Sequence, residues 1–163
     1  MPLPPLSESA VDLSARASDW RDAVRLAGAA LRRAGKTRDS YTERMIQVID
    51  DFGAYIVIAP GLALVHARPG PDVLADGLSV VTLADPVSFG HPHNDPVRVV
   101  VGLAVANSDA HVTSVASLAN IFNDPDSIPQ LAEAASVSDV RRVFGQQDEA
   151  APADEPEMEG SPS

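Results

Sequence analysis

The sequence contains no cysteine, which excludes disulfide bonds, thiolate metal sites and cysteine nucleophiles. Aromatic residues make up only 4% of the 163 residues, whereas hydrophobic residues make up 45%, so a core must be built from Ala, Val, Leu and Ile. No apolar run approaches the roughly 18–20 residues that cross a bilayer. The first residues also lack the basic and then apolar segments of a signal peptide. The length and these absences predict one aliphatic domain in the cytosol, with no direct membrane insertion.

Basic residues are scarce as well. The chain has 12 Lys and Arg against 23 Asp and Glu, a formal net charge of −11. Residues 146–163 hold six of the acidic residues and no basic one, which leaves −5 on the rest. This composition predicts a disordered acidic tail over 146–163, a flexible terminus over 1–9 and a folded domain over 10–145. An acidic body argues against nucleic-acid binding, because that function needs a basic face.

Hydrophobic spacing predicts two helices in the first third of the chain. Residues 19–35 place their apolar side chains on one face, with Ser18 as the N-cap and Gly35 just past the end. A second helix follows Thr37–Asp39 and ends near Asp51–Gly53. Its inward residues are Tyr41, Met45, Val48 and Ile49.

The rest of the chain alternates between strand-like and helical patterns. Buried strands are predicted at AYIVIA, LSVVTLA and PVRVVVGLAVA, with an early strand near Ala10–Leu13. Three helices follow: one capped by Ser108 or Asp109, one starting at Asp124 with Pro125, and one capped by Ser136. Apolar strands covered by helices on both sides predict an α/β domain of mixed layers.

Two histidines lie at the ends of predicted sheet elements. His66 follows an apolar strand-like run and a glycine-containing turn, and His111 lies in the first turn of a helix that follows a strand. A helix N-terminus suits a phosphoryl group and keeps a nearby imidazole neutral. A neutral imidazole can attack phosphorus and hold the phosphoryl group covalently, and Arg68 is placed to pair with its oxygens. The residues alone leave open whether these histidines are catalytic or structural.

The segment HPHND offers a second interpretation. His91, His93 and Asp95 have the side chains of a metal-dependent hydrolase, because two histidines one residue apart can share a metal ion. Pro92, Gly90 and the following Pro96 are instead typical of a turn that leads into a strand. The alternative interpretation is that both histidines are loop residues.

The string GAYIVIAPGLALVHARPG resembles the active-site segment of the EIIA domains of the bacterial phosphoenolpyruvate-dependent sugar phosphotransferase system. The resemblance is to the fructose/mannitol superfamily and, within it, to the ascorbate-type branch. It continues through DGLSVVTLADPVSFG, NDPVRVVVGLAVANSDAH, SLANIFND and SVSDVRRVF. Upstream, the predicted helix pair is similar to the paired N-terminal helices of the family. The resemblance thus covers about Val11 to Phe144.

The resemblance implies a phosphoryl carrier with a mixed β-sheet flanked by helices. It implies that His66 accepts a phosphoryl group from the phosphocarrier HPr and passes it to a cysteine of the partner EIIB, with the membrane EIIC involved indirectly. His111 matches the supporting histidine, and Arg68 and Ser108 are candidates for stabilising the phosphoryl oxygens. The branch implies ascorbate or a similar carbohydrate, and the family implies no metal or organic cofactor.

One position departs from the family pattern. Proline usually precedes the active histidine, and here Val65 does. Proline fixes φ and removes an N–H donor, so we expect altered loop rigidity with the chemistry retained. A regulatory domain that binds a partner according to its phosphorylation state fits the sequence as an alternative to transport. The aliphatic face of a helix is compatible with a homodimer.

Overall fold

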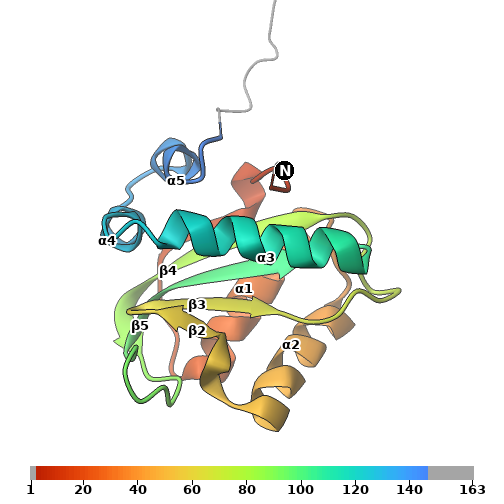
Figure 1. The fold of residues 1–163 in the computed structure, drawn as a ribbon, viewed down its shortest axis with the longest axis horizontal. Coiled ribbons are helices and arrows are strands. Elements are labelled where there is room, and N and C mark those ends of the chain that lie inside the picture. The colour runs from red at the N-terminus through yellow and green to blue at the C-terminus, as the bar shows by residue number, and fades with distance from the viewer. Residues whose placement is uncertain (1–2, 147–163) are drawn as a thin grey trace, which may run out of the picture.

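The structure, a computed structural model that describes residues 3–146, is a mixed five-stranded sheet with helices on both faces (Figure 1). The strand order is β1-β4-β5-β3-β2; β1 pairs parallel with β4 and β3 with β5, while β4–β5 and β2–β3 are antiparallel. This confirms the predicted mixed α/β class. The strands are β1 (Val11–Ala15), β2 (Val57–Ala59), β3 (Leu62–His66), β4 (Gly77–Val87) and β5 (Val97–Ala104).

The sheet separates the core into two aliphatic clusters, one on each of its faces. One face packs on α1 and α2, and the other packs on α3, α4 and α5. Alternation along β3 serves both, since Ala63 and Val65 point to the first cluster and Leu62 and Leu64 to the second. The helices are α1 (Trp20–Arg33), α2 (Asp39–Phe52), α3 (Ser108–Phe122), α4 (Ser127–Ala132) and α5 (Val137–Val143).

Helix starts differ from the predicted ones by one to three residues. The side chain of Asp19, not Ser18, caps α1 by accepting from the Asp22 N–H at 2.9 Å. Asn107 caps α3, because it has the extended backbone that a cap requires, whereas Ser108 is already helical. Pro125 precedes α4, which begins at Ser127. The predicted cap at Ser136 of α5 is confirmed.

The string AYIVIA is not one buried strand. Gly53 ends α2 with φ of 85°, and a 3₁₀ turn, η2 (Ala54–Ile56), follows before the short edge strand β2. Gly61, with φ of 83°, then reverses the chain into β3, a strand that the predicted order did not count. A short apolar run cannot distinguish a turn from a strand by its period. As a result Tyr55 is 54% exposed.

The segment predicted to be a flexible N-terminus is packed over residues 3–9. Leu6 is only 1% exposed and joins the cluster under α3 to α5. Its N–H donates to the side chain of Gln146 at 2.9 Å, and its carbonyl accepts from Arg141 at 3.0 Å. The two ends of the described chain thereby close over one face of the sheet. Most of the predicted tail, residues 147–163, lies outside the described residues.

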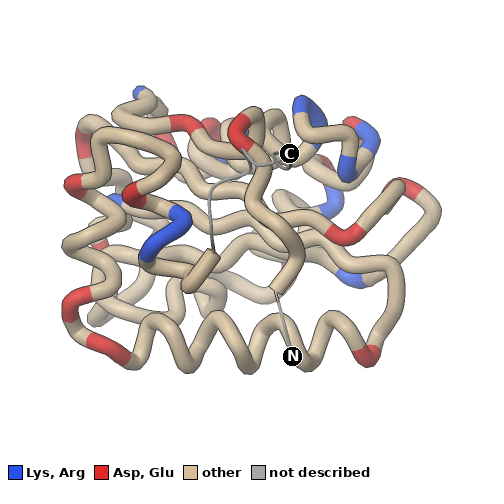
Figure 2. Tube along the Cα trace, turned by 90° about the horizontal axis from the view of Figure 1, so that it is seen from above, with Lys and Arg blue, Asp and Glu red and all other residues tan. Residues whose placement is uncertain are grey.

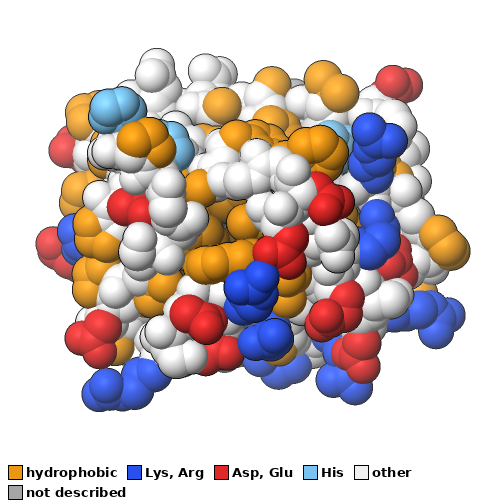
Figure 3. All heavy atoms as spheres, turned by 90° about the horizontal axis from the view of Figure 1, so that it is seen from below, with side chains coloured by type: hydrophobic (Ala, Val, Ile, Leu, Met, Phe, Trp, Pro, Cys, Tyr) orange, Lys and Arg blue, Asp and Glu red, His pale blue; other side chains and the backbone are white. Residues whose placement is uncertain are grey.

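Helices α1 and α2 are joined by ion pairs between Arg21 and Asp50 and between Arg32 and Asp39. Figure 3 shows the face seen from below in Figure 1, with acidic and basic side chains interspersed around apolar patches. A face with both signs mixed in this way is unlike the basic footprint of a nucleic-acid interface.

Gly102 lets α1 approach the sheet closely. A Cβ at this position would lie 2.4 Å from Ser79 Oγ and 3.4 Å from side-chain carbons of Ala27 and Leu31. We expect Gly102→Ala to lower the free energy of unfolding by about 1–3 kcal/mol, measured by urea denaturation. Adding Ser79→Ala removes the clashing oxygen and is expected to recover part of the loss. Equal stability of wild type and Gly102→Ala would contradict this packing account.

Candidate functional site

His66 and His111 meet at one edge of the sheet. His66 is the last residue of β3, and its place in the alternation turns it to the side of Leu62 and Leu64, the face covered by α3. His111 lies in the first turn of α3, which follows the neighbouring parallel strand β5. The two ring centroids are 5.1 Å apart, with planes at 51°. Parallel strands place their carboxyl ends together, which is why residues distant in sequence form one site.

The backbone determines which nitrogen of His66 is free to react. Nδ1 lies 3.0 Å from the carbonyl oxygen of Leu64, which can only accept a hydrogen bond. In the neutral ring Nδ1 therefore carries the proton, and Nε2 keeps its lone pair. This arrangement leaves Nε2 as the ring nitrogen of His66 with a free lone pair.

The surroundings of both imidazoles favour the neutral form. Burial lowers the pKa of His66, and the nearby His111 lowers it further when protonated, while the hydrogen bond to Leu64 opposes the shift. Burial also lowers the pKa of His111. Two neutral histidines side by side supply an unprotonated nucleophile and a second nitrogen for hydrogen bonding near neutral pH.

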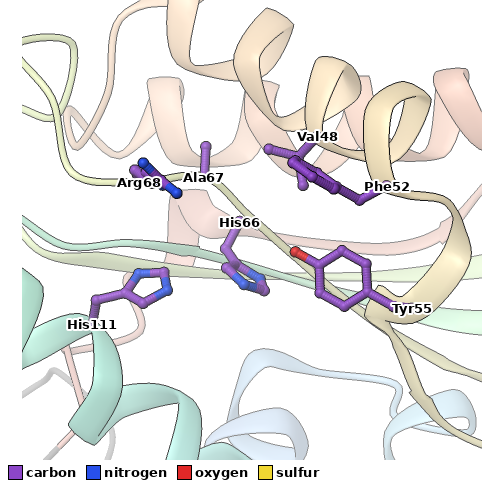
Figure 4. A pocket seen from close by; sticks show the side chains of 7 residues that line it. All are labelled: Val48, Phe52, Tyr55, His66, Ala67, Arg68 and His111. Carbon is purple, nitrogen blue, oxygen red and sulfur yellow. The ribbon is translucent and has the colours of Figure 1, made fainter.

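The rings open into a cavity of about 410 Å³ between α2 and α3 (Figure 4). Of the four predicted site residues, the structure brings three together here, His66, His111 and Arg68. Ser108 is exposed at the start of α3 and does not line the cavity. The remaining lining residues are Val48, Phe52, Tyr55 and Ala67.

Tyr55 and Phe52 are the aromatic lining residues, and the sequence did not indicate either as part of the site. Figure 4 shows the hydroxyl of Tyr55 turned toward His66, and Phe52 is 71% exposed at the end of α2. Tyr55 was assigned to a buried strand because its segment is β-branched. The signal that could have found it is Gly53, since a glycine after a helical pattern marks a change of chain direction.

The loop that follows His66 is anchored to α2. Asp72 accepts two hydrogen bonds from the guanidinium of Arg44, at 2.6 and 2.9 Å, and a third from Ser40 at 3.1 Å. Arg44 holds the pKa of Asp72 below its usual range, and the same hydrogen bonding raises the pKa of Arg44. These contacts anchor the loop after His66. Val65, which stands before His66 where the family usually has proline, is a buried residue of β3 and not part of this loop.

The segment HPHND forms a hydrogen-bonded turn. The carboxylate of Asp95 accepts from the side chain of Ser88 and from the backbone N–H groups of residues 89–91. Nδ1 of His91 accepts from the N–H groups of His93 and Asn94. Within residues 3–146, no three His, Asp or Glu side chains are placed to hold a metal ion. The geometry therefore accounts for Asp95 and His91 as turn residues.

Comparison with known proteins identifies the family. Residues 5–147 match the model of the phosphoenolpyruvate-dependent sugar phosphotransferase system, EIIA 2. The chain belongs to this family. This confirms the family that the sequence resemblance indicated.

Curated EIIA relatives point to one branch. The chain is 34% identical over 122 residues to the ascorbate-specific PTS system EIIA component of Escherichia coli K12, covering 74% of this chain and 79% of the relative. It is 32% identical over 133 residues to the component of the same name from Salmonella choleraesuis, covering 81% and 86%.

Solved EIIA structures share the fold. A PTS IIA protein from Streptococcus mutans superposes with a TM-score of 0.76 at 29% identity, covering 85% of this chain and 88% of that one. The enzyme IIAMTL in its complex with phosphorylated enzyme IIBMTL from Escherichia coli gives 0.77 at 26% identity, covering 88% and 99%. None of the described helices is both long and apolar enough to span a membrane.

Proposed function

We propose that this EIIA is a phosphoryl carrier that accepts a phosphoryl group from phosphorylated HPr on Nε2 of His66 and passes it to a cysteine of an EIIB. The observation that carries this proposal is the free Nε2 of a neutral histidine, facing a cavity beside a second neutral histidine. The ascorbate-specific relatives favour ascorbate or a similar carbohydrate as the substrate of the complete system.

The chemistry follows from the tautomer. The lone pair of Nε2 attacks phosphorus, a new N–P bond forms, and the N–P bond of the donor breaks with its electron pair returning to the donor nitrogen. The ring of His66 then carries a positive charge and keeps its Nδ1 proton. The Leu64 carbonyl, 3.0 Å away, accepts from that N–H and stabilises the charge. Attack by a partner thiolate on phosphorus reverses the sequence and returns neutral His66.

Three residues are the groups that we propose to stabilise the equatorial oxygens of the phosphoryl group. Arg68 and His111 line the same cavity as His66, and Figure 4 shows the hydroxyl of Tyr55 turned toward His66. Phosphoryl transfer is catalysed by such positioning and charge stabilisation. Ser108, outside the cavity, remains a weaker candidate for the same role.

The surroundings of the cavity suit docking of a protein. Phe52 and Tyr55, which line the cavity, are exposed by 71% and 54%. Val112, which follows His111 on α3, is exposed by 68%. Helix α3, which carries His111, holds Asp109 as its single charged residue (Figure 2). Exposed apolar groups at a site mark interaction surfaces, and low charge reduces the desolvation cost of docking.

The test is transfer through purified components. The chain is incubated with phosphoenolpyruvate, enzyme I and HPr, and its intact mass is measured before and after adding an EIIB. We expect one acid-labile phosphoryl group, located on Nε2 by NMR and lost on addition of EIIB but not of its Cys→Ser variant. No uptake while HPr itself is phosphorylated would overturn the proposal. Uptake without onward transfer, together with binding of a partner that depends on phosphorylation, would instead favour the regulatory alternative.

Removing the Tyr55 hydroxyl tests the stabilising group that the sequence missed. We expect Tyr55→Phe to slow phosphorylation of His66 by about five- to tenfold, because one hydrogen bond to the transition state is lost while the aromatic ring remains. The measurement is the initial rate of phosphorylation. Tyr55→Leu, which also removes the ring from the docking surface, should slow it further; equal rates for Tyr55→Phe and wild type would remove the hydroxyl from the mechanism.

A further inference from the structure

Tyr41 is a core residue whose hydroxyl contacts the backbone next to His66. It lies in the first turn of α2, is fully buried, and its hydroxyl contacts the backbone of both strands that lead to the histidines. The hydroxyl accepts a hydrogen bond from the N–H of Ala67 at 3.0 Å and donates to the carbonyl of Leu103 at 2.6 Å. The carbonyl of Ala67, at 3.2 Å, is a second acceptor within reach.

These contacts fall where the parallel strands β3 and β5 separate. The last pair in their ladder is His66 with Leu103. Beyond it the chain after β3 enters the loop with Arg68, while the chain after β5 turns into α3 with His111. The hydroxyl of Tyr41 thus occupies the fork between the strands and satisfies a donor on one and an acceptor on the other.

The fork lies next to His66. Ala67 follows His66 in the chain, and Leu103 is paired with His66 across the ladder. The Tyr41 hydroxyl therefore links the backbone that follows His66 to the backbone opposite it. Without the hydroxyl, the Ala67 N–H and the Leu103 carbonyl would either remain unpaired or move together to pair directly. Either change alters where His66 stands relative to His111, whose ring lies 5.1 Å away.

We propose that Tyr41 is a positioning residue of the phosphoryl-transfer site, which holds the β3–β5 fork open so that Nε2 of His66 faces the cavity. This inference rests on the proposed function of His66. The bond persists across the working pH range, since burial raises the pKa of Tyr41 to about 12.

The experiment compares wild type with Tyr41→Phe and with Ser79→Ala. Ser79 is a matched control, because its hydroxyl is also buried and donates to a backbone carbonyl, that of Ala27, at 3.0 Å, but does not line the cavity. Phosphoramidate is the donor, because a small molecule requires no protein docking. The readouts are the initial rate of His66 phosphorylation, with release of ammonia, and the titration of the His66 ring followed by NMR.

We expect Tyr41→Phe to slow phosphorylation by about ten- to a hundredfold, because a small displacement of a reacting atom has a large effect on rate. Its His66 titration should also move, while Ser79→Ala stays within about twofold of wild type in rate. Folded Tyr41→Phe with an unchanged rate and titration would overturn the inference. If wild type takes no phosphoryl group from phosphoramidate or from phosphorylated HPr, the proposed function fails, whereas the titration still tests Tyr41.

A second variant covers the case in which Tyr41→Phe does not fold. The chain has two tyrosines, so in a Tyr55→Phe background 3-fluorotyrosine labels Tyr41 alone. Fluorine makes the hydroxyl a stronger donor to Leu103 and a weaker acceptor from Ala67, with little change in shape. We expect the rate and the His66 titration to move relative to unlabelled Tyr55→Phe. No change in either would overturn the inference.

Discussion

Replacing His66 with Gln is expected to leave the protein folded and to abolish phosphoryl acceptance. Gln keeps an N–H that can donate toward the Leu64 carbonyl but has no nucleophilic lone pair on nitrogen. His66 is half-buried at the cavity edge, so the change creates no large hole in the core. The measurement is intact mass after incubation with phosphorylated HPr, at times when wild type is fully modified. The expected loss is total, because His66 is the proposed acceptor and His111 is proposed only to support it.

Two histidine variants complete this test. His93→Gln changes an exposed histidine of the 88–95 turn and is expected to be phosphorylated like wild type. His111→Gln is expected to accept the phosphoryl group more slowly, by about 10- to 1000-fold, since it loses a supporting contact but not the nucleophile. Full modification of His66→Gln would show that another residue carries the phosphoryl group.

The second large effect concerns pH. Because the pKa of His66 is lowered, its ring stays neutral and nucleophilic below pH 6.5, the ordinary value. As pH falls through the lowered pKa, the neutral fraction and the rate of phosphorylation should fall, by about tenfold for each further pH unit. Phosphoramidate is the donor, and free imidazole is the reference acceptor. Because the donor is the same in both reactions, the ratio of the two rates does not depend on the titration of the donor. The half-maximal pH for the protein should lie below that for imidazole.

The same shift affects stability in a known direction. The unfolded state binds a proton at His66 at a higher pH than the folded state, so the free energy of unfolding decreases as pH falls from about 6.5 to the folded pKa. His66→Gln should remove this contribution, which urea denaturation at several pH values would show. If the phosphorylation rate of the protein depends on pH in the same way as that of free imidazole, burial does not lower the pKa of His66.

Periodicity and turn chemistry were enough to predict the long elements, and the family resemblance singled out the two histidines. Helices α1 and α2 and strands β4 and β5 repeat an apolar pattern over enough residues to define their type. Their positions at the ends of predicted sheet elements made His66 and His111 candidates, and the resemblance gave them their expected roles. Arg68 was predicted because it is two residues from His66, and the structure does place it on the cavity.

Tyr41 and Tyr55 show why the rest could not be predicted. Tyr41 fits the apolar face of α2, and nothing in the sequence says that its hydroxyl meets two strands far along the chain. Tyr55 belongs to a run of six residues, too short for its period to separate a 3₁₀ turn from a strand. Both roles depend on long-range geometry that a local pattern does not contain.

The number of residues in strand β3 determines which face of the sheet His66 points to. It has five residues, begins directly after the reversal at Gly61 and ends at His66, and its side chains alternate between the two faces of the sheet. A single residue inserted or deleted between Gly61 and His66 would exchange the faces: Val65 would point into the cavity and the imidazole into the apolar layer under α1 and α2. Substitutions in β3 can therefore be absorbed by repacking, but its length cannot change by one residue without exchanging the two faces.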